Sequence, residues 1–102
     1  MSGSIFVDTN VLVYAHDQTD PTKNARAQGV LLDLWATRRG TTSAQVLLEF
    51  FTVISRKVAR PIPPSEARTL VSLYLRGWPV VWPSADLIES ALGRAQPVSG
   101  AM

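Results

Sequence analysis

Near its N-terminus the chain reads Ile5-Phe6-Val7-Asp8-Thr9-Asn10-Val11-Leu12-Val13-Tyr14-Ala15, a short apolar run, three polar residues and a second apolar run. The three apolar residues 5–7 predict a short buried strand that ends at Asp8. Thr9 and Asn10 are good residues for beginning a helix, so one or two apolar helical turns are expected to follow them. The stretch predicts a strand that leads directly into a helix.

The rest of the chain continues to alternate helices with short strands. Asp20 caps the next helix, Pro21 takes its first position, and Gly40 lies just past its expected end. Prolines border the last strand, which predicts that it is short or lies at an edge. The expected helices span residues 21–37, 43–57, 65–77 and 84–94, and the expected strands span residues 41–42 and 78–83. This order predicts an α/β fold with a parallel sheet.

Composition restricts the class of protein before any motif is considered. The 102 residues are 46% hydrophobic and 18% charged, which is typical of one globular domain. The absence of cysteine excludes disulfides, thiolate zinc sites and cysteine nucleophiles, and it agrees with a reducing cytoplasm. No stretch approaches the roughly 18 consecutive apolar residues that a membrane span needs. The N-terminus lacks the basic region of a secretory signal, so such a signal is not expected.

Asp8 is the first candidate for chemistry. It stands at the carboxyl end of a predicted strand, where ligand crevices form in open α/β sheets. A carboxylate there can hold a hard cation, accept a hydrogen bond from a substrate, or act as a nucleophile. The structural alternative is that Asp8 caps its own helix.

Glu49 is the second candidate. On the helix that Ser43 caps, it belongs to a polar stripe along one edge of a wide apolar arc, so we expect its carboxylate to be half-buried. The positions three and four residues later are Thr52 and Val53, which offer no local ion pair. Either a cation or an arginine from elsewhere in the fold is expected to meet this carboxylate.

Basic side chains are concentrated at two points of the chain. Residues 1–51 carry five acids and four bases, whereas residues 52–102 carry three acids and six bases, and the whole chain has a formal net charge of +2. The two groups comprise Arg38 and Arg39, and then Arg56, Lys57 and Arg60. Such groups can contact phosphates, although solvated helix ends explain them equally well.

Other chemistries have weaker support. His16 is the only histidine, which excludes a histidine-rich zinc site, and we expect it at the surface as a hydrogen-bonding group. Tyr14 and the three tryptophans are expected in the core rather than as stacking platforms for bases. The scattered glycines form no phosphate-binding loop, and no nucleophile-elbow serine motif occurs.

Two motifs resemble those of a known family, the PIN-domain nucleases. The first resembles their opening motif and comprises Phe6-Val7-Asp8-Thr9-Asn10-Val11-Leu12-Val13-Tyr14-Ala15. The second comprises Thr42-Ser43-Ala44-Gln45-Val46-Leu47-Leu48-Glu49-Phe50-Phe51 and follows after one intervening helix. The subset most similar is the VapC-type toxin ribonuclease of prokaryotic toxin–antitoxin pairs, and the resemblance covers residues 5–94.

The resemblance implies a three-layer α/β/α fold and a Mg²⁺- or Mn²⁺-dependent endoribonuclease. Asp8 and Glu49 match the first two metal-binding acids of the family, and Thr9, Asn10 and Ser43 match the polar positions around them. Bound metal ions would activate water and offset charge on the scissile phosphate. Expected partners are the RNA substrate, a cognate antitoxin and a second subunit.

The sequence departs from the family pattern at its C-terminal end. PIN domains carry a third and usually a fourth acid, which we do not find, and they continue with two further strands. We therefore expect residues 1–102 to be a single, interrupted PIN-like domain. Because the family orders its sheet 3-2-1-4-5, residues 5–7 would become an edge strand, which predicts marginal stability, self-association or strand donation by a partner.

Two alternatives to a ribonuclease remain. The first is a catalytically inactive PIN domain that binds an antitoxin or a sister subunit through its helices. The second is a phosphotransfer or dehalogenase-like domain with Asp8 as nucleophile. Enzymes of that second kind usually have another acid two residues later, where this chain has Asn10.

Overall fold

The computed structural model describes residues 3–82 and residue 85. The described elements follow in the order β1 (Ile5–Phe6), α1 (Thr9–His16), α2 (Pro21–Thr37), β2 (Gly40–Ser43), α3 (Ala44–Thr52), η1 (Val53–Lys57), α4 (Pro64–Gly77) and β3 (Val80–Val81). This order confirms the predicted alternation of helices and strands. Nearly all of the helix expected at residues 84–94 lies outside the described residues.

The three strands form a short parallel sheet in the order β1-β2-β3. Ile5 and Phe6 pair with Gly40 and Thr41, and the second half of β2 pairs with β3. The backbone pairing continues one residue beyond β1, because the Val7 N–H donates to the Thr41 carbonyl at 2.8 Å. Both expected edge positions are confirmed among the described strands: β1 lies at one edge and β3 at the other.

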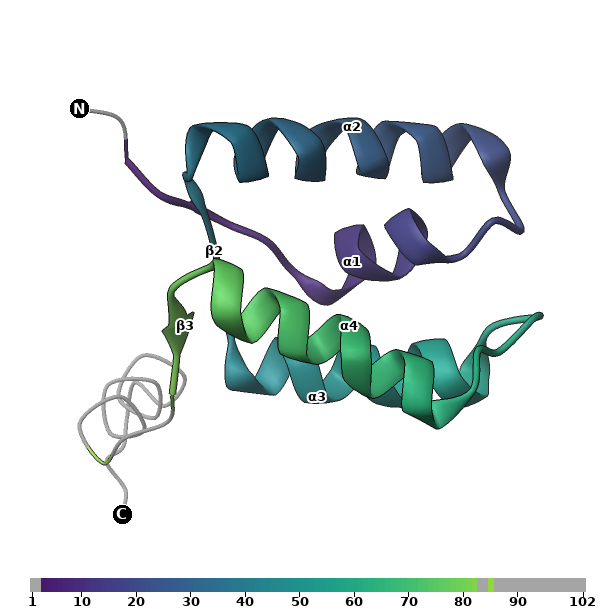
Figure 1. Ribbon diagram of the computed structural model, residues 1–102. Coiled ribbons are helices and arrows are strands. Elements are labelled where there is room, and N and C mark those ends of the chain that lie inside the picture. The colour runs from purple at the N-terminus through teal and green to yellow at the C-terminus, as the bar shows by residue number, and fades with distance from the viewer. Residues whose placement is uncertain (1–2, 83–84, 86–102) are drawn as a thin grey trace, which may run out of the picture.

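Helices lie on both sides of the centre of the molecule (Figure 1). The long helix α2 lies on one side of α1 and β2, and α3 and α4 lie together on the other side. Helix α2 buries Ala27, Leu31 and Leu34, the positions that its apolar periodicity predicts. Across the core, α3 and η1 contribute Leu47, Phe50 and Ile54. The apolar stripes of the helices therefore meet around α1 and the sheet.

Local capping residues begin two of these helices where the sequence predicts. The Asp20 carboxylate accepts from the Lys23 N–H at 3.1 Å, and the Ser43 hydroxyl oxygen accepts from the Val46 N–H at 3.1 Å. The helix after Ser43 ends at Lys57 as predicted, but its last five residues, η1, have π-helical rather than α-helical hydrogen bonding. No membrane-crossing helix is found among the described residues, since none is both long and apolar enough.

The role expected for Gly40 is wrong. Helix α2 ends instead at Arg38, which adopts the left-handed conformation with φ of 57°. Gly40 lies inside β2, where a Cβ would come within 2.5 Å of Cε2 of the buried Trp78. Glycine is required at this position because the indole packs directly on the strand backbone.

The expectation for the aromatic residues is right for Trp78 and wrong for two other tryptophans. Trp78 is 4% exposed, whereas Trp35 and Trp82 are 40% and 62% exposed. Within the aromatic cluster, Tyr74 contacts Trp35, Trp78 and Phe50 with ring centroids 5.1 to 6.2 Å apart. Burial raises the pKa of Tyr74 to about 12.

His16, the last residue of α1, is a hydrogen-bonding group as expected, but it is half-buried rather than at the surface. Its Nε2 shares a hydrogen bond with the Tyr74 hydroxyl at 2.8 Å, and its ring lies 5.5 Å from that of Phe50. Burial lowers the pKa of His16 below its ordinary value of 6.5. The sequence contains a pattern that predicts this burial: His16 follows the buried Leu12 by four positions and therefore lies on the same helix face.

Candidate functional site

Asp8 lies where β1 passes into α1. Its Oδ1 accepts from the Val11 N–H at 3.3 Å, so Asp8 caps the helix, as the structural alternative holds. The side chain is nevertheless exposed. A carboxylate has about four lone-pair positions, and one long capping bond leaves the others available. Capping and cation binding are therefore compatible at this residue.

Glu49 reaches the same place from α3. Its Oε1 accepts from the Thr9 hydroxyl at 2.7 Å, although the two residues are 40 positions apart. Because Thr9 directly follows Asp8, this bond brings the two predicted acids to the same end of the sheet. The expectation that Glu49 is half-buried is wrong: its side chain is exposed. The inward face of α3 is occupied by Leu47 and Phe50, which turns the polar stripe toward the opening of the site.

The polar residues expected around the acids have different roles. The Ser43 hydroxyl oxygen caps α3, and Asn10 lies exposed in the first turn of α1. Thr42 is fully buried, and its hydroxyl donates to the Val7 carbonyl at 3.0 Å. This bond joins β2 to the residue before Asp8 and holds the two strand ends together.

A shallow cleft adjoins Glu49. Its volume is about 350 Å³, and it is lined by Gln45, Leu48, Glu49, Thr52, Val53 and Lys57. The cleft follows the polar edge of α3 and η1 that the sequence predicts. Its charged groups are the Glu49 carboxylate and the Lys57 ammonium group.

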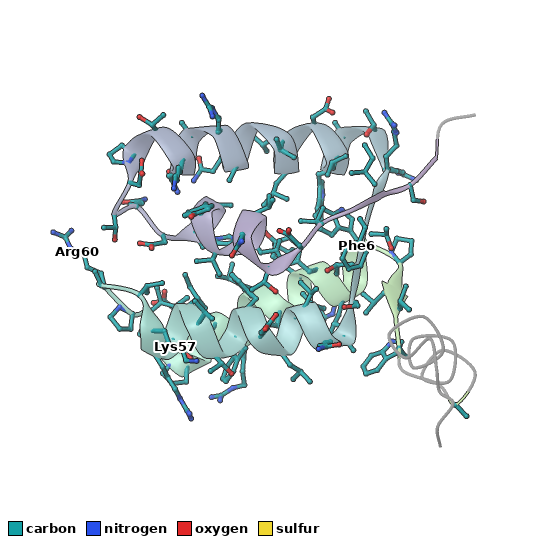
Figure 2. The ribbon with its side chains drawn as sticks, turned by 180° about the vertical axis from the view of Figure 1, so that it is seen from behind. Phe6, Lys57 and Arg60 are labelled. Carbon is teal, nitrogen blue, oxygen red and sulfur yellow. The ribbon has the colours of Figure 1, made fainter. Side chains whose placement is uncertain are left out.

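The two basic groups occupy different parts of the molecule. Lys57 and Arg60 lie at one end and Phe6 of β1 at the other (Figure 2). The Arg39 Nε donates to the Gly3 carbonyl at 3.2 Å, which places this arginine beside the amino end of β1. Arg38 ends α2 next to it, and Arg56 lies beside Lys57 in η1. Of the five basic candidates, Lys57 lines the cleft with Glu49.

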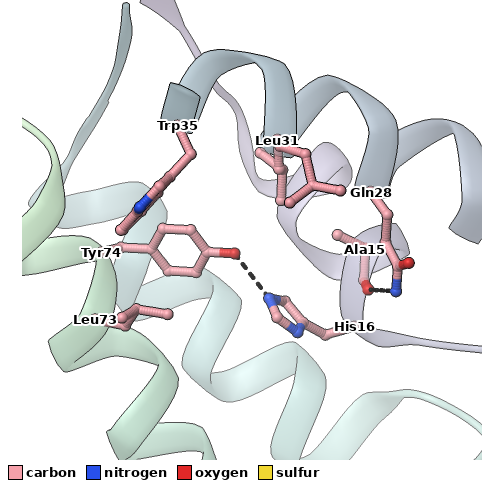
Figure 3. A pocket seen from close by; sticks show the side chains of 8 residues that line it. Ala15, His16, Gln28, Leu31, Trp35, Leu73 and Tyr74 are labelled. Atoms are coloured by element: carbon pink, nitrogen blue, oxygen red, sulfur yellow. Dashed lines mark hydrogen bonds between the residues drawn. The ribbon is translucent and has the colours of Figure 1, made fainter. Parts of the chain in front are cut away.

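A second, larger pocket lies apart from the two acids (Figure 3). Its volume is about 400 Å³, and it is lined by Ala15, His16, Gln28, Leu31, Leu32, Trp35, Leu73 and Tyr74. Its polar groups are already engaged, since His16 bonds to Tyr74 and Gln28 donates to the Ala15 carbonyl. With no carboxylate in its lining, this groove is an apolar surface between α1, α2 and α4.

The donor set at the acids fits one hard cation. Asp8 and Glu49 supply carboxylate oxygens, which Mg²⁺ and Mn²⁺ prefer, and Mg²⁺ usually keeps several waters besides one or two carboxylates. Within residues 3–82 and residue 85, no three or more histidine, aspartate or glutamate side chains come together. The described acids would therefore offer ligands for one ion rather than two.

Comparison with known families identifies the family of the chain. The PIN domain model matches residues 5–96, nearly the whole chain. No curated protein matches the chain. The matched span contains the parallel sheet, the surrounding helices and both acids. The chain therefore belongs to the PIN-domain family, whose members are generally nucleases.

Proposed function

We propose that this chain is a metal-dependent endoribonuclease of the VapC toxin type that hydrolyses phosphodiester bonds of RNA in the cytoplasm and is silenced by a cognate antitoxin. Residues 1–102 act in this proposal as one PIN-like domain. The observation that carries it is the bond from Thr9 to Glu49, which holds the Glu49 carboxylate beside the residue that follows Asp8, at the carboxyl end of β1 in a parallel sheet.

Asp8 and Glu49 would hold Mg²⁺ or Mn²⁺. Such an ion, when bound, supplies a water of lowered pKa and positive charge for the phosphate. The chain itself contributes positioning: the Thr9 hydroxyl orients the Glu49 carboxylate, and the start of α1 orients Asp8. Asn10 and Ser43 complete the polar surroundings.

RNA would approach along the cleft beside α3. The Lys57 ammonium lies in this cleft with Glu49 and attracts the phosphate backbone toward the acids. Arg56 and Arg60 extend the positive charge from the same end of the molecule. Arg38 and Arg39 lie at the other end of the sheet and would contact RNA outside this cleft.

The test is cleavage of a structured RNA by the full chain in Mg²⁺ or Mn²⁺. We expect Asp8→Asn and Glu49→Gln each to reduce the cleavage rate by at least about 100-fold, because each removes a charged ligand. Asp33→Asn is the matched control, since Asp33 is an exposed carboxylate on α2. EDTA should abolish cleavage and added Mn²⁺ should restore it. Equal rates for all three variants would contradict the proposal.

A second function is supported by the apolar groove of Figure 3. A PIN domain without catalysis could use it to bind an antitoxin or a sister subunit, and the exposed Leu32 and Leu73 at its rim favour such a contact. The two functions differ in one result. A chain that is folded by circular dichroism but does not cleave RNA in either metal would favour the binding module.

A further inference from the structure

The cleft that adjoins Glu49 runs along two kinds of helix. Its lining begins with Gln45, Leu48 and Glu49 of α3, and it ends with Lys57, the last residue of the π-helical segment η1 (Figure 2). π-Helical turns are rare in proteins, and many of them lie at functional sites. A turn of this kind changes which of the following side chains reach the cleft.

The π-helical turn determines which basic side chain shares the cleft with Glu49. In a continuous α-helix, seven residues make about two full turns, so Arg56 would lie on the face of Glu49 and Lys57 would lie roughly 100° further around the axis. A π-helical turn contains more residues than an α-helical turn, which shifts the side chains by about one position. In the structure, Lys57 lines the cleft, whereas Arg56 does not. The polar stripe that contains Glu49 therefore continues to Lys57 instead of Arg56.

Local contacts hold this segment in place. The Ser55 hydroxyl donates to the Phe51 carbonyl at 2.6 Å. Hydroxyl bonds of this kind, to the carbonyl four residues earlier, often bend helices. The side chain of Ile54 is fully buried in the core and anchors the segment from the inside. The exposed Lys57 side chain therefore extends from a backbone segment that is fixed to the core.

Lys57 and Glu49 are separated by a distance that suits two phosphates rather than one. Eight residues along the helix correspond to about 12 Å at 1.5 Å per residue. At its own end, the Glu49 carboxylate is held by the Thr9 hydroxyl at 2.7 Å, beside Asp8. The separation exceeds the size of a single phosphate group, and it matches a second phosphate of the same strand.

The rest of the cleft suits the nucleoside that connects two phosphates. Its other lining residues are all uncharged, and they comprise Gln45, Leu48, Thr52 and Val53. Leu48 is 69% exposed and offers an apolar surface, while the Gln45 amide offers hydrogen-bonding groups. A base or a ribose uses both kinds of contact. The volume of about 350 Å³ is in the range of small-ligand sites.

We propose that Lys57 forms a second phosphate subsite, which holds a backbone phosphate of a bound single strand other than the phosphate at the two acids. The connecting nucleoside occupies the uncharged part of the cleft. An unpaired strand fits this arrangement, because its nucleosides are free to enter a cleft. The inference rests on the proposed function, since the metal ion assigned to Asp8 and Glu49 provides the first point of attachment.

Single strands with two charged phosphates at a chosen spacing test the subsite. The strands carry neutral methylphosphonate linkages except at one or two positions, and fluorescence anisotropy measures their affinity for the full chain in Mn²⁺. At one preferred spacing, we expect two phosphates to bind at least about 10-fold more tightly than one, because both contacts form at once. Lys57→Gln should abolish this gain, and Lys57→Arg should keep it. Equal affinity at every spacing in the natural chain would overturn the proposal.

Two arginine variants distinguish the subsite from a general effect of charge. Arg56→Gln removes the same charge from the residue next to Lys57, which lies outside the cleft lining, and it should keep the gain. Arg26→Gln removes the same charge from α2 and should keep the gain as well. An equal loss in all three glutamine variants would overturn the subsite in favour of net charge. Loss of the gain in Arg56→Gln alone would overturn the role of the π-helical turn.

Cleavage distinguishes a failure of the subsite from a failure of the proposed function. If RNA is cleaved in a manner that depends on Asp8, but Lys57→Gln keeps the full gain in affinity, the nuclease function stands and the subsite is refuted. If the gain requires both Lys57 and Mn²⁺, but no RNA is cleaved, the subsite stands and the nuclease function is refuted.

Discussion

At the scale of single residues, the hydroxyl of Thr9 is the group that ties the two acids to one place. It donates to Oε1 of Glu49 at 2.7 Å from a position next to Asp8. Hydrogen bonds from neighbouring groups orient metal-binding carboxylates, and their loss commonly costs 10- to 100-fold in metal affinity or activity. The geometry of the site therefore depends on a residue that binds no metal in our proposal.

We expect Thr9→Val to weaken Mn²⁺ binding by about 10-fold, because the isosteric side chain cannot donate to Glu49. Isothermal titration with Mn²⁺ measures this directly, and RNA cleavage should fall with it. Thr9→Ser retains the donor and should keep the affinity of the natural chain. Equal affinities for the valine and serine variants would show that the hydroxyl does not position Glu49.

At position 40, close packing determines that the residue must be glycine. Its backbone lies against the indole of Trp78, with three ring atoms 2.5 to 2.9 Å from the place of a Cβ. We expect Gly40→Ala to lower the free energy of unfolding by about 1–3 kcal/mol, since β2 or the indole must move. Urea denaturation measures the change.

Gly29→Ala is the control for that experiment. Gly29 lies inside α2, and a Cβ at this position would have no atom within 4 Å outside the backbone of its own helix. Alanine there should raise the free energy of unfolding by about 0.5–1 kcal/mol, because it is the better helix former. Similar losses in both variants would contradict the close approach of Trp78 to β2.

At the scale of elements, α1 is joined to α4 through a polar pair within an apolar cluster. His16 of α1 bonds to Tyr74 of α4, and both rings contact Phe50 of α3 (Figure 3 shows the bond). A neutral imidazole satisfies this geometry whichever partner donates. Three helices therefore depend on the charge state of one side chain.

We expect this cluster to make stability depend on pH below neutrality. Burial lowers the pKa of His16 in the folded state, so the unfolded state binds more protons near pH 6. Stability is therefore complete above pH 6.5 and falls as the pH decreases through the folded-state pKa. Urea denaturation at several pH values should show this slope in the natural chain, and His16→Gln should reduce it. An unchanged slope in the variant would assign the pH dependence to other groups.

At the scale of the whole molecule, positive charge is divided between two ends. Lys57 and Arg60 lie at the end of the molecule opposite Phe6, whereas Arg39 lies beside the start of β1 (Figure 2). The formal net charge of +2 does not show how the basic side chains are distributed between these two ends.

We expect Lys57→Gln to weaken RNA binding and to reduce the slope of log affinity against log salt by about 0.7, the value for one phosphate contact on a single strand. Binding is measured by fluorescence anisotropy in EDTA, so that cleavage does not interfere. Arg26→Gln on α2 is the control, since α2 lies across α1 from α3, whose residues line the cleft (Figure 1). Equal slopes for both variants would mean that the cleft beside Glu49 is not the RNA path.

The elements of this fold could be predicted from the amino-acid sequence alone. Helix starts at Asp20 and Ser43 depend on side chains within one turn, and apolar periodicity marks the buried face of α2. The order of strands and helices and the two PIN motifs were equally readable, because each depends on adjacent residues.

Which side chains meet across those elements could be learned only from the folded chain. The bond of Thr9 to Glu49, the bond of His16 to Tyr74 and the glycine requirement at position 40 each depend on a partner 38 to 58 residues away. The separation of the two basic groups likewise follows from the direction in which β1 and η1 run. Contacts at such distances are set by the packing of whole faces against each other, and local sequence patterns mark a buried face without specifying which face it meets.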